Sequence, residues 1–326
     1  MIDFLSLLKT TGAYKTFVND KKSHALSHAY LVVSPEKKYL SDYLKVFAKI
    51  VACGETEPCL TCRTCKAIDA DSYADVLTFP KDKESILTAD VETLIAESYV
   101  KPVENDKKIF ILNHAETMNA SAQNKLLKTL EEPPKNVIII MGATTTYPLL
   151  STVMSRVKKI EISEFSDELI IKALENDCQN KEKLLTAVQS GDGTVGRAKA
   201  LYDDGNALMV TGLVFDVLIN MSSSKDVLKY SNKIAKISDV TDFISCLETT
   251  LGDLLYLIQG KENLIKNKTN LALLKSVKGF NSGSILYALE KITESYKRKK
   301  FNANPTMLIE WLIFSILEGK YKWQKL

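Results

Sequence analysis

Four cysteines crowd into a stretch of thirteen residues in the first quarter of the chain. They stand at Cys53, Cys59, Cys62 and Cys65, and the last three are separated by two residues each. Four thiolates at this spacing can surround one tetrahedral zinc ion and leave no position for water. The spacing therefore predicts a structural zinc site. Four reduced thiols without metal remain an alternative, as does an iron–sulfur cluster, although the further cysteines of ferredoxin-type runs are missing.

A second stretch that could carry chemistry follows the apolar run Tyr30–Val33. A phosphate-binding loop at this place needs glycines, whose backbone amides curl around phosphate, and a lysine that reaches the β- and γ-phosphates. Ser34, Lys37 and Tyr39 stand at the glycine positions and Leu40 at the lysine position. We therefore expect no phosphate cradle. An ordinary strand-to-helix loop, unrelated to any phosphate-binding loop, is the alternative interpretation.

A third stretch follows the apolar run Lys108–Leu112, where a Walker B strand would end in acidic residues. Magnesium needs a carboxylate there and the attacking water needs a base. Asn113 and His114 occupy the two positions instead. His114 could in principle act as a base, but without a triphosphate it has no substrate, so a structural histidine is favoured. The sequence predicts that neither ATP nor magnesium is bound.

Two basic features complete the candidates. Arg156 follows Thr152–Ser155, shortly after an apolar run. An arginine on the rim of a nucleotide-binding fold can reach the γ-phosphate of a neighbouring subunit, but from these residues alone an ordinary surface or salt-bridged arginine is favoured. Tyr296–Lys300 is a short basic run, for which a solvated helix face is favoured over contact with DNA phosphates.

The elements that must position these residues alternate between strand and helix up to about residue 163. The apolar run Val137–Met141 is nearly unbroken, as expected of a parallel strand covered on both faces. Strands are predicted at 30–33, 76–79, 108–112, 137–141 and 159–162, and helices at 42–51, 88–99 and 121–132. This rhythm predicts a doubly wound parallel sheet.

Beyond Ser163 the pattern is helical throughout, with short helices predicted at 167–176, 181–189 and 195–202 and a last one at 305–317. We therefore predict three domains. Residues 1–163 form the nucleotide-binding fold with the cysteine module at 53–65, residues 164–207 a three-helix lid, and residues 208–326 a helical oligomerisation domain.

Composition limits the classes of protein to which this chain can belong. The 326 residues are 45% hydrophobic, which is enough for a sizeable core, and 43 basic against 40 acidic residues give a net charge of only +3. This balance argues against a dedicated nucleic-acid coat protein. We see no membrane span or signal peptide and expect a cytoplasmic protein. In that reducing compartment clustered cysteines favour metal over disulfides, and the lone Cys178 and Cys246 are expected to be buried.

Several segments together resemble the clamp-loader subunits of bacterial DNA polymerase III, within the AAA+ group. The carriers are Ser27–Leu31, the cysteine module, Asn119–Pro134 and Ser155–Arg156. The resemblance covers residues 10–165 well and 166–200 loosely, and Asn302–Glu310 supports it near the end. It implies an AAA+ parallel-sheet domain with degenerate nucleotide motifs, a helical lid and an all-α collar.

The similarity is greatest to the delta prime subunits, which do not hydrolyse ATP. It implies that Arg156 acts in trans as an arginine finger and that the four cysteines bind zinc. Thr144 and Gly196–Arg197 match the two sensor positions, idle here, and Val157 replaces the cysteine that follows the family's arginine. The implied partners are gamma/tau and delta subunits, the sliding clamp and primed DNA. An ATP-hydrolysing gamma or tau type subunit and a zinc-containing nucleic-acid-binding protein are the alternatives.

Overall fold

The computed structural model describes residues 2–81, 85–189, 191, 193–203, 206–237, 240–267, 270–300 and 303–322. The chain divides into two compact units, of which the first is Met1–Leu169 with Thr194–Gly196 and the second is Ile170–Gly193 with Arg197–Leu326. The predicted boundary near residue 163 lies close to the end of the first stretch. The further division into a lid at 164–207 and a collar at 208–326 stays a prediction.

The first unit is built on a sheet of five parallel strands in the order β2-β3-β4-β1-β5. The strands are β1 (Ala29–Val33), β2 (Val76–Phe79), β3 (Lys108–Leu112), β4 (Val137–Ala143) and β5 (Lys158–Glu161). In the centre, Ala29 of β1 lies opposite Ile139 of β4. All five predicted strands are present, and the predicted α/β parallel-sheet fold is confirmed.

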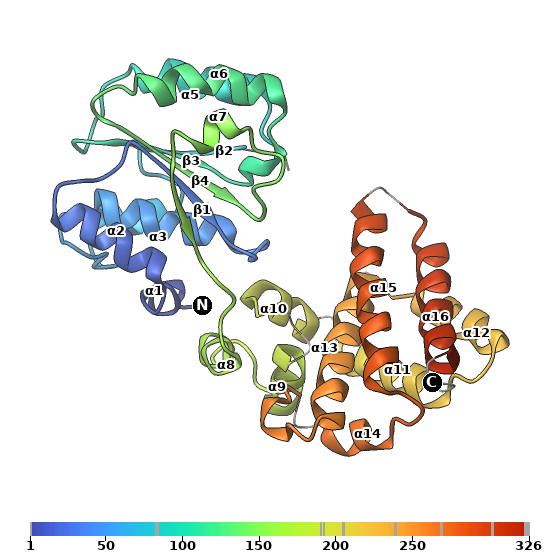
Figure 1. The fold of residues 1–326 in the computed structure, drawn as a ribbon. Coiled ribbons are helices and arrows are strands. Elements are labelled where there is room, and N and C mark those ends of the chain that lie inside the picture. The colour runs from blue at the N-terminus through green and yellow to red at the C-terminus, as the bar shows by residue number, and fades with distance from the viewer. Residues whose placement is uncertain are drawn as a thin grey trace. The chain divides into compact units, whose positions relative to one another are not determined.

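Helices cover both faces of this sheet (Figure 1). On one side lie α2 and α3, and on the other α5 and α6. The helices of the unit are α1 (Phe4–Lys9), α2 (Gly12–Lys22), α3 (Leu40–Ala52), α4 (Arg63–Asp69), α5 (Thr88–Ser98), the 3₁₀ turn η1 (Ala115–Thr117), α6 (Ala120–Glu131) and α7 (Ser151–Met154). Because β3 and β4 are buried along their whole length, they need apolar side chains on both faces, which explains their unbroken apolar runs.

Local sequence explains where α6 begins and ends. The side chain of Asn119 accepts a hydrogen bond from the amide of Ala122, which satisfies one of the free donors at the helix start. The helix ends at Glu131, and Pro133–Pro134 follow, which cannot continue it. Glu131 is therefore the last residue of α6, the helix that precedes β4 in the sequence.

Helix α3 packs against β4 at a glycine. A Cβ atom built on Gly142 would lie 2.6 Å from Leu44 Cδ1 and 3.1 Å from Leu40 Cγ. Any larger residue would push the helix away or force these two leucines to repack. Since Leu40 begins α3, the glycine sets how closely the loop after β1 approaches the carboxyl end of β4.

A buried carboxylate ties the loop before β3 to the start of β2. Asp75 is 1% exposed, and its two oxygens accept hydrogen bonds from the amides of Val103 at 2.7 Å, Glu104 at 2.6 Å and Asn105 at 2.9 Å. Asn105 in turn donates to the carbonyl of Ala52 at the end of α3. The carboxylate therefore organises the loop that borders the cysteine module.

We expect Asp75→Ala to destabilise the first unit by about 2–4 kcal/mol, because three backbone donors lose a charged acceptor. Thermal unfolding should then begin about 5–15 °C lower, as measured by differential scanning calorimetry. The exposed Asp106 supplies a matched control, and Asp106→Ala should change stability by less than about 0.5 kcal/mol. Equal melting curves for the two variants would contradict this role of Asp75.

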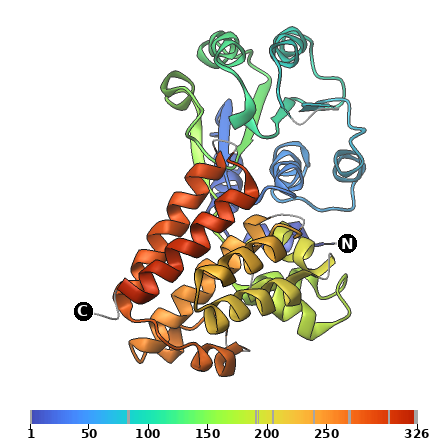
Figure 2. The same cartoon turned by 90° about the vertical axis from the view of Figure 1, so that its right-hand side faces the viewer.

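Every regular element described in the second unit is a helix, and one large core cluster runs through the unit. Its longest helices are α13, α15 and α16, and the last two run side by side in both views (Figures 1 and 2). From α8 onward the helices are α8 (Asp167–Leu174), which begins in the first unit, α9 (Lys181–Gln189), α10 (Val195–Asp203), α11 (Asn206–Asn220), α12 (Ser224–Ile234), α13 (Val240–Ile258), η2 (Glu262–Leu264), α14 (Leu271–Ser276), α15 (Ser282–Lys300) and α16 (Pro305–Lys322).

The last helix begins where the sequence predicts, at Pro305, and the Asn304 side chain accepts hydrogen bonds from the amides of Thr306 and Met307. Of the segment Asn302–Glu310, Asn302 lies outside the described residues. Among the helices that the structure describes, none has the length and apolar content needed to cross a membrane.

Candidate functional site

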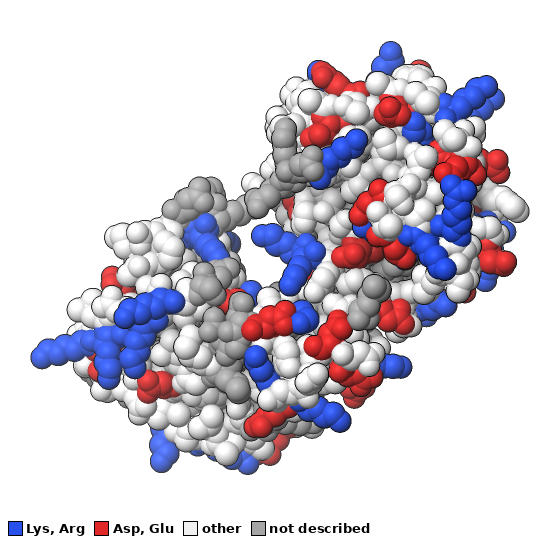
Figure 3. All heavy atoms as spheres, turned by 180° about the vertical axis from the view of Figure 1, so that it is seen from behind, with Lys and Arg blue, Asp and Glu red and all other residues white. Residues whose placement is uncertain are grey.

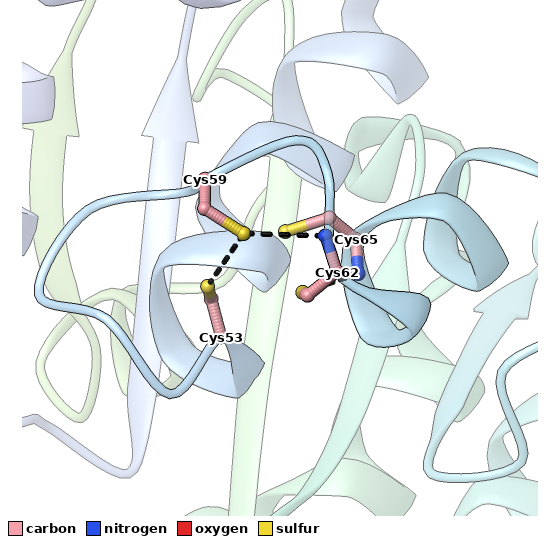
Figure 4. Close-up of side chains that lie close together, drawn as sticks. All are labelled: Cys53, Cys59, Cys62 and Cys65. Atoms are coloured by element: carbon pink, nitrogen blue, oxygen red, sulfur yellow. Dashed lines mark hydrogen bonds between the residues drawn. The ribbon is translucent and has the colours of Figure 1, made fainter.

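The four clustered cysteines converge on one point (Figure 4). Their sulfur atoms all lie within 4.8 Å of one another, and Cys53 Sγ is 3.7 Å from Cys59 Sγ. Sulfurs placed about 2.3 Å from a central zinc would be separated by about 3.8 Å. The four thiols are free of disulfides. The donor set and its spacing can therefore hold a metal ion such as zinc.

Two helix ends position these thiols. Cys53 is the C-cap of α3, Cys62 is the N-cap of α4, and Cys65 follows in the first turn of α4. The amide of Cys62 donates to Cys59 Sγ at 3.4 Å, and the amide of Cys65 donates to Cys62 Sγ at 3.3 Å. The helix start thus supplies two amide donors to sulfur, an arrangement that stabilises thiolates.

The thiols differ in their acidity. The amide of Cys62, together with hydrogen bonds from Thr61, lowers the pKa of Cys59 to about 6. Burial raises the pKa of Cys65 to about 12, because a thiolate in that position would lose its hydration. A bound cation would offset this penalty, since metal ligation requires deprotonated sulfur.

Helices α1 and α2 hold the loop between Cys53 and Cys59, a role that sequence reasoning missed. Lys21 Nζ donates to the carbonyls of Cys53 at 2.6 Å and Glu55 at 2.5 Å. The Tyr14 hydroxyl donates to Glu57 at 3.0 Å, and Lys9 pairs with the same carboxylate at 3.0 Å. Because these partners are separated by more than thirty residues along the chain, no local spacing reveals them.

The loop between β1 and α3, where a phosphate cradle was considered, is closely packed. The amide of Ser34 donates to the carbonyl of Ala143 in β4 at 3.0 Å. Tyr39 is the N-cap of α3 and its ring lies 5.1 Å from that of Phe4, while Lys37 is exposed. Leu40, at the position of the lysine, is fully buried. Sequence reasoning missed Glu36, whose buried carboxylate accepts backbone hydrogen bonds inside this loop.

At the carboxyl end of β3, His114 belongs to a small polar network. Its Nδ1 lies 3.1 Å from Glu116 Oε1, and Thr144 Oγ1 donates to the same oxygen at 2.8 Å. Burial by itself raises the pKa of Glu116, but the hydrogen bonds from His114 and Thr144 outweigh it and lower that pKa. This arrangement favours a structural role for His114 and Thr144. Asn113 precedes the network, and its Oδ1 is buried without a hydrogen-bond partner among the described residues.

Arg156 lies just after α7 and is held by its own segment. Its Nη1 donates to the carbonyl of Thr152 at 2.9 Å and to Ser155 Oγ at 3.1 Å. Its Nη2 forms an ion pair with Glu131 Oε1 at 2.6 Å, and the side chain remains 33% exposed. Sequence reasoning missed Glu131 as well.

An open hollow of about 710 Å³ lies beside Arg156 within the first unit. It is lined by His28, Leu130, Glu131, Ser155, Arg156, Val157 and Lys158. Val157, at the position of the family's cysteine, is partly buried against the core of the unit. The guanidinium group therefore stands on a rim that a neighbouring molecule can reach.

A buried glutamine connects this rim to the end of β3. Gln123 of α6 is 1% exposed, and its Nε2 donates at 3.0 Å to the carbonyls of Met118 and Pro148. Its Oε1 accepts from the amide of Leu150, the N-cap of α7, at 2.7 Å. The polar residue on the buried face of α6 was the sequence signal that could have identified it.

Two of the remaining basic candidates, Arg298 and Arg197, have acidic partners within the second unit, and the side chain of Lys300 lies outside the described residues. Arg298, inside the run Tyr296–Lys300, pairs with Glu294 at 2.7 Å and stacks 3.8 Å above the ring of Trp311. Arg197 pairs with Asp242 at 2.7 Å. On the face drawn in Figure 3, basic and acidic side chains are interspersed over the first unit. These contacts favour a structural use of the basic residues over a dedicated nucleic-acid surface.

Comparison with known proteins identifies relatives of this chain. The family model described as "DNA polymerase III, delta subunit" matches residues 9–166. The DNA polymerase III subunit delta prime of Bacillus subtilis is 33% identical over 158 residues, which are 48% of this chain and 48% of that protein. The subunit tau of the same bacterium is 27% identical over 268 residues, 76% of this chain and 45% of that protein. The chain thus spans about half or less of the length of the curated relatives it matches.

Among solved structures, a gamma subunit-related protein of Thermotoga maritima aligns over 93% of this chain and 99% of its own, at 18% identity and a TM-score of 0.48. The segment that the family model matches contains the cysteine cluster, the loop after β1 and Arg156. Residues 9–166, nearly half of the chain, are thus similar to DNA polymerase III subunits of the delta and delta prime type.

Proposed function

We propose that this protein is a delta prime-type subunit of a clamp loader, which lends an arginine to a neighbouring ATPase and hydrolyses no ATP itself. It would act in the cytoplasm with gamma or tau and delta subunits to place the sliding clamp on primed DNA. The similarity of residues 9–166 to DNA polymerase III delta and delta prime subunits supports the assembly, and the geometry of the first unit supports the division of labour.

One observation carries the proposal. The same unit exposes a guanidinium group beside a hollow and buries an apolar side chain at the position expected for a phosphate-binding lysine. Arg156 is partly exposed on the rim, whereas Leu40 is buried where a lysine would meet phosphate, and Asn113 replaces the carboxylate that would hold magnesium. An arginine remains available to a partner in a subunit that lacks the groups for binding a triphosphate.

The arginine acts by electrostatic stabilisation across the interface. On assembly the Arg156 guanidinium exchanges the Glu131 carboxylate for the γ-phosphate of ATP bound to the neighbouring subunit. Its planar fork of donors then stabilises the charge that develops on the phosphoryl oxygens. Gln123 keeps the loop before α7 in place while Arg156 changes partner.

We also propose that the four cysteines hold a structural zinc ion. The ion would join the C-terminus of α3 to the N-terminus of α4, and all four coordination positions would be filled by sulfur. Such a site stabilises the fold and takes no part in catalysis. If the cysteines held an iron–sulfur cluster instead, the purified protein would absorb visible light.

Reconstitution tests the proposed function. The purified chain, mixed with gamma or tau and delta subunits from the same organism, should co-elute with them on size-exclusion chromatography and support clamp-dependent ATP hydrolysis. By itself it should show no measurable binding of ATP with magnesium by calorimetry. Micromolar ATP affinity of the lone chain would point to an active gamma or tau type subunit, and tight, salt-sensitive DNA binding without partners would point to a nucleic-acid-binding protein.

A further inference from the structure

The carboxylate of Glu36 lies inside the β1–α3 loop, among backbone amides at the start of α3. Its Oε1 accepts hydrogen bonds from the amide of Lys38 at 2.9 Å and from that of Tyr39 at 3.1 Å. These two amides lie at the start of α3, which runs for thirteen residues and whose dipole favours negative charge at that end. The residue is 1% exposed, so the carboxylate is enclosed by protein.

A third amide reaches the same carboxylate from a distant part of the chain. The amide of Gly196 donates to Glu36 Oε2 at 2.8 Å across a sequence separation of 160 residues. Gly196 belongs to Thr194–Gly196, the short segment that returns to the first unit. Thr194 and Val195 are buried as well, so this segment is packed into the unit.

The approach of Gly196 to Glu36 is close enough to require glycine. A Cβ atom at this position would lie 2.2 Å from Glu36 Oε1 and 2.7 Å from Lys38 Cβ. The two oxygens of Glu36 therefore have different partners. One accepts hydrogen bonds from the β1–α3 loop, and the other accepts one from the returning segment.

We propose that Glu36 is a built-in substitute for a bound phosphate: its carboxylate fills the anion position of the β1–α3 loop and fastens Thr194–Gly196 to that loop. Three backbone amides that converge on one enclosed carboxylate form an anion nest whose ligand is supplied by the chain itself. This inference does not depend on the clamp-loader assembly, because every group in it belongs to the first unit. On this basis we expect the loop to exclude phosphate, independently of the missing lysine.

Hydrogen exchange followed by mass spectrometry on the full chain tests the proposal. In Glu36→Ala, amides in the segments 34–40 and 194–198 should exchange about tenfold faster or more than in the parent protein, because they lose a charged acceptor. Inorganic phosphate or pyrophosphate at millimolar concentration should slow exchange in both segments of the variant and leave the parent protein unchanged. Glu161→Ala, which removes an exposed carboxylate paired with Lys159, is the matched control and should behave like the parent.

Two results would overturn the proposal. One is unchanged exchange in both segments of Glu36→Ala, and the other is protection of the parent protein by phosphate as strong as that of the variant. If Glu36→Ala does not fold, Glu36→Asp decides the question. Its carboxylate is one methylene shorter and cannot reach both sides, so at least one of the two segments must lose protection. Full protection of both segments in that variant would also refute the role of Glu36.

Discussion

Arg156→Ala is expected to abolish most of the ATP hydrolysis at the neighbouring site that this subunit faces, without loss of assembly. An arginine supplied in trans contributes about 10³–10⁵ to the rate of phosphoryl transfer. Single-turnover hydrolysis, measured in a reconstituted complex whose other ATPase sites are inactivated, should therefore fall by at least about 10³. The fold should survive, because the polar partners of the Arg156 side chain among the described residues are Thr152, Ser155 and Glu131, all at the surface.

Two further variants separate chemistry from charge. Arg156→Lys keeps the positive charge but loses the planar fork of donors, so it should recover little of the rate. Lys159→Ala removes an exposed charge nearby that pairs with Glu161 and should leave hydrolysis within about twofold of the parent value. If Arg156→Ala also stays within twofold while the complex assembles, the proposed arginine finger is wrong.

Glu131 provides a test of the exchange of partners. This carboxylate holds the guanidinium group at 2.6 Å in the isolated chain. We expect Glu131→Ala to retain ATP hydrolysis at the neighbouring site in the same single-turnover assay. Loss of hydrolysis in Arg156→Ala together with retained hydrolysis in Glu131→Ala would show that the arginine is required and the ion pair is not.

Removal of the metal is the second large expected effect. We expect about one zinc per chain by elemental analysis, and Cys65→Ser should reduce it to less than about one-tenth, because a closed four-sulfur site tolerates no missing ligand. If the site contributes about 3 kcal/mol, a fraction of what small zinc domains obtain, the first unit should melt about 6–12 °C lower. Calorimetry with and without a chelator measures the same loss in the parent protein.

The pH dependence of metal binding follows from the same thiols. Ligation requires deprotonated sulfur, so protons compete with the ion and zinc is lost as the pH falls. The amide donors that lower the pKa of Cys59 to about 6 delay this loss, whereas the burial that raises the pKa of Cys65 promotes it.

Cys178→Ala is the matched control for Cys65→Ser, since this buried cysteine lies outside the cluster and its variant should keep the metal. A zinc content of zero in the parent protein, purified without chelators, would remove the assignment.

The sequence by itself determined the parallel-sheet fold and the candidate metal ligands. Apolar runs such as Val137–Met141 report burial on both faces directly, since every residue of β4 is buried. The cysteines lie on one short segment, and their spacing nearly fixes their geometry, so the four sulfurs meet as predicted. Local signals also placed both ends of α6 to within one residue and the start of α16 at Pro305.

Only the tertiary structure decided which polar groups complete these sites. The contact of Glu36 with Gly196 spans 160 residues, that of Lys21 with Cys53 spans 32, and Arg156 meets Glu131 across a strand and a helix. A glutamate that accepts hydrogen bonds from buried amides and a glutamate that is solvated look alike in a sequence. Their difference arises when parallel strands bring distant loops to the same edge of a sheet, which depends on the packing of the whole unit and not on the spacing of neighbours along the chain.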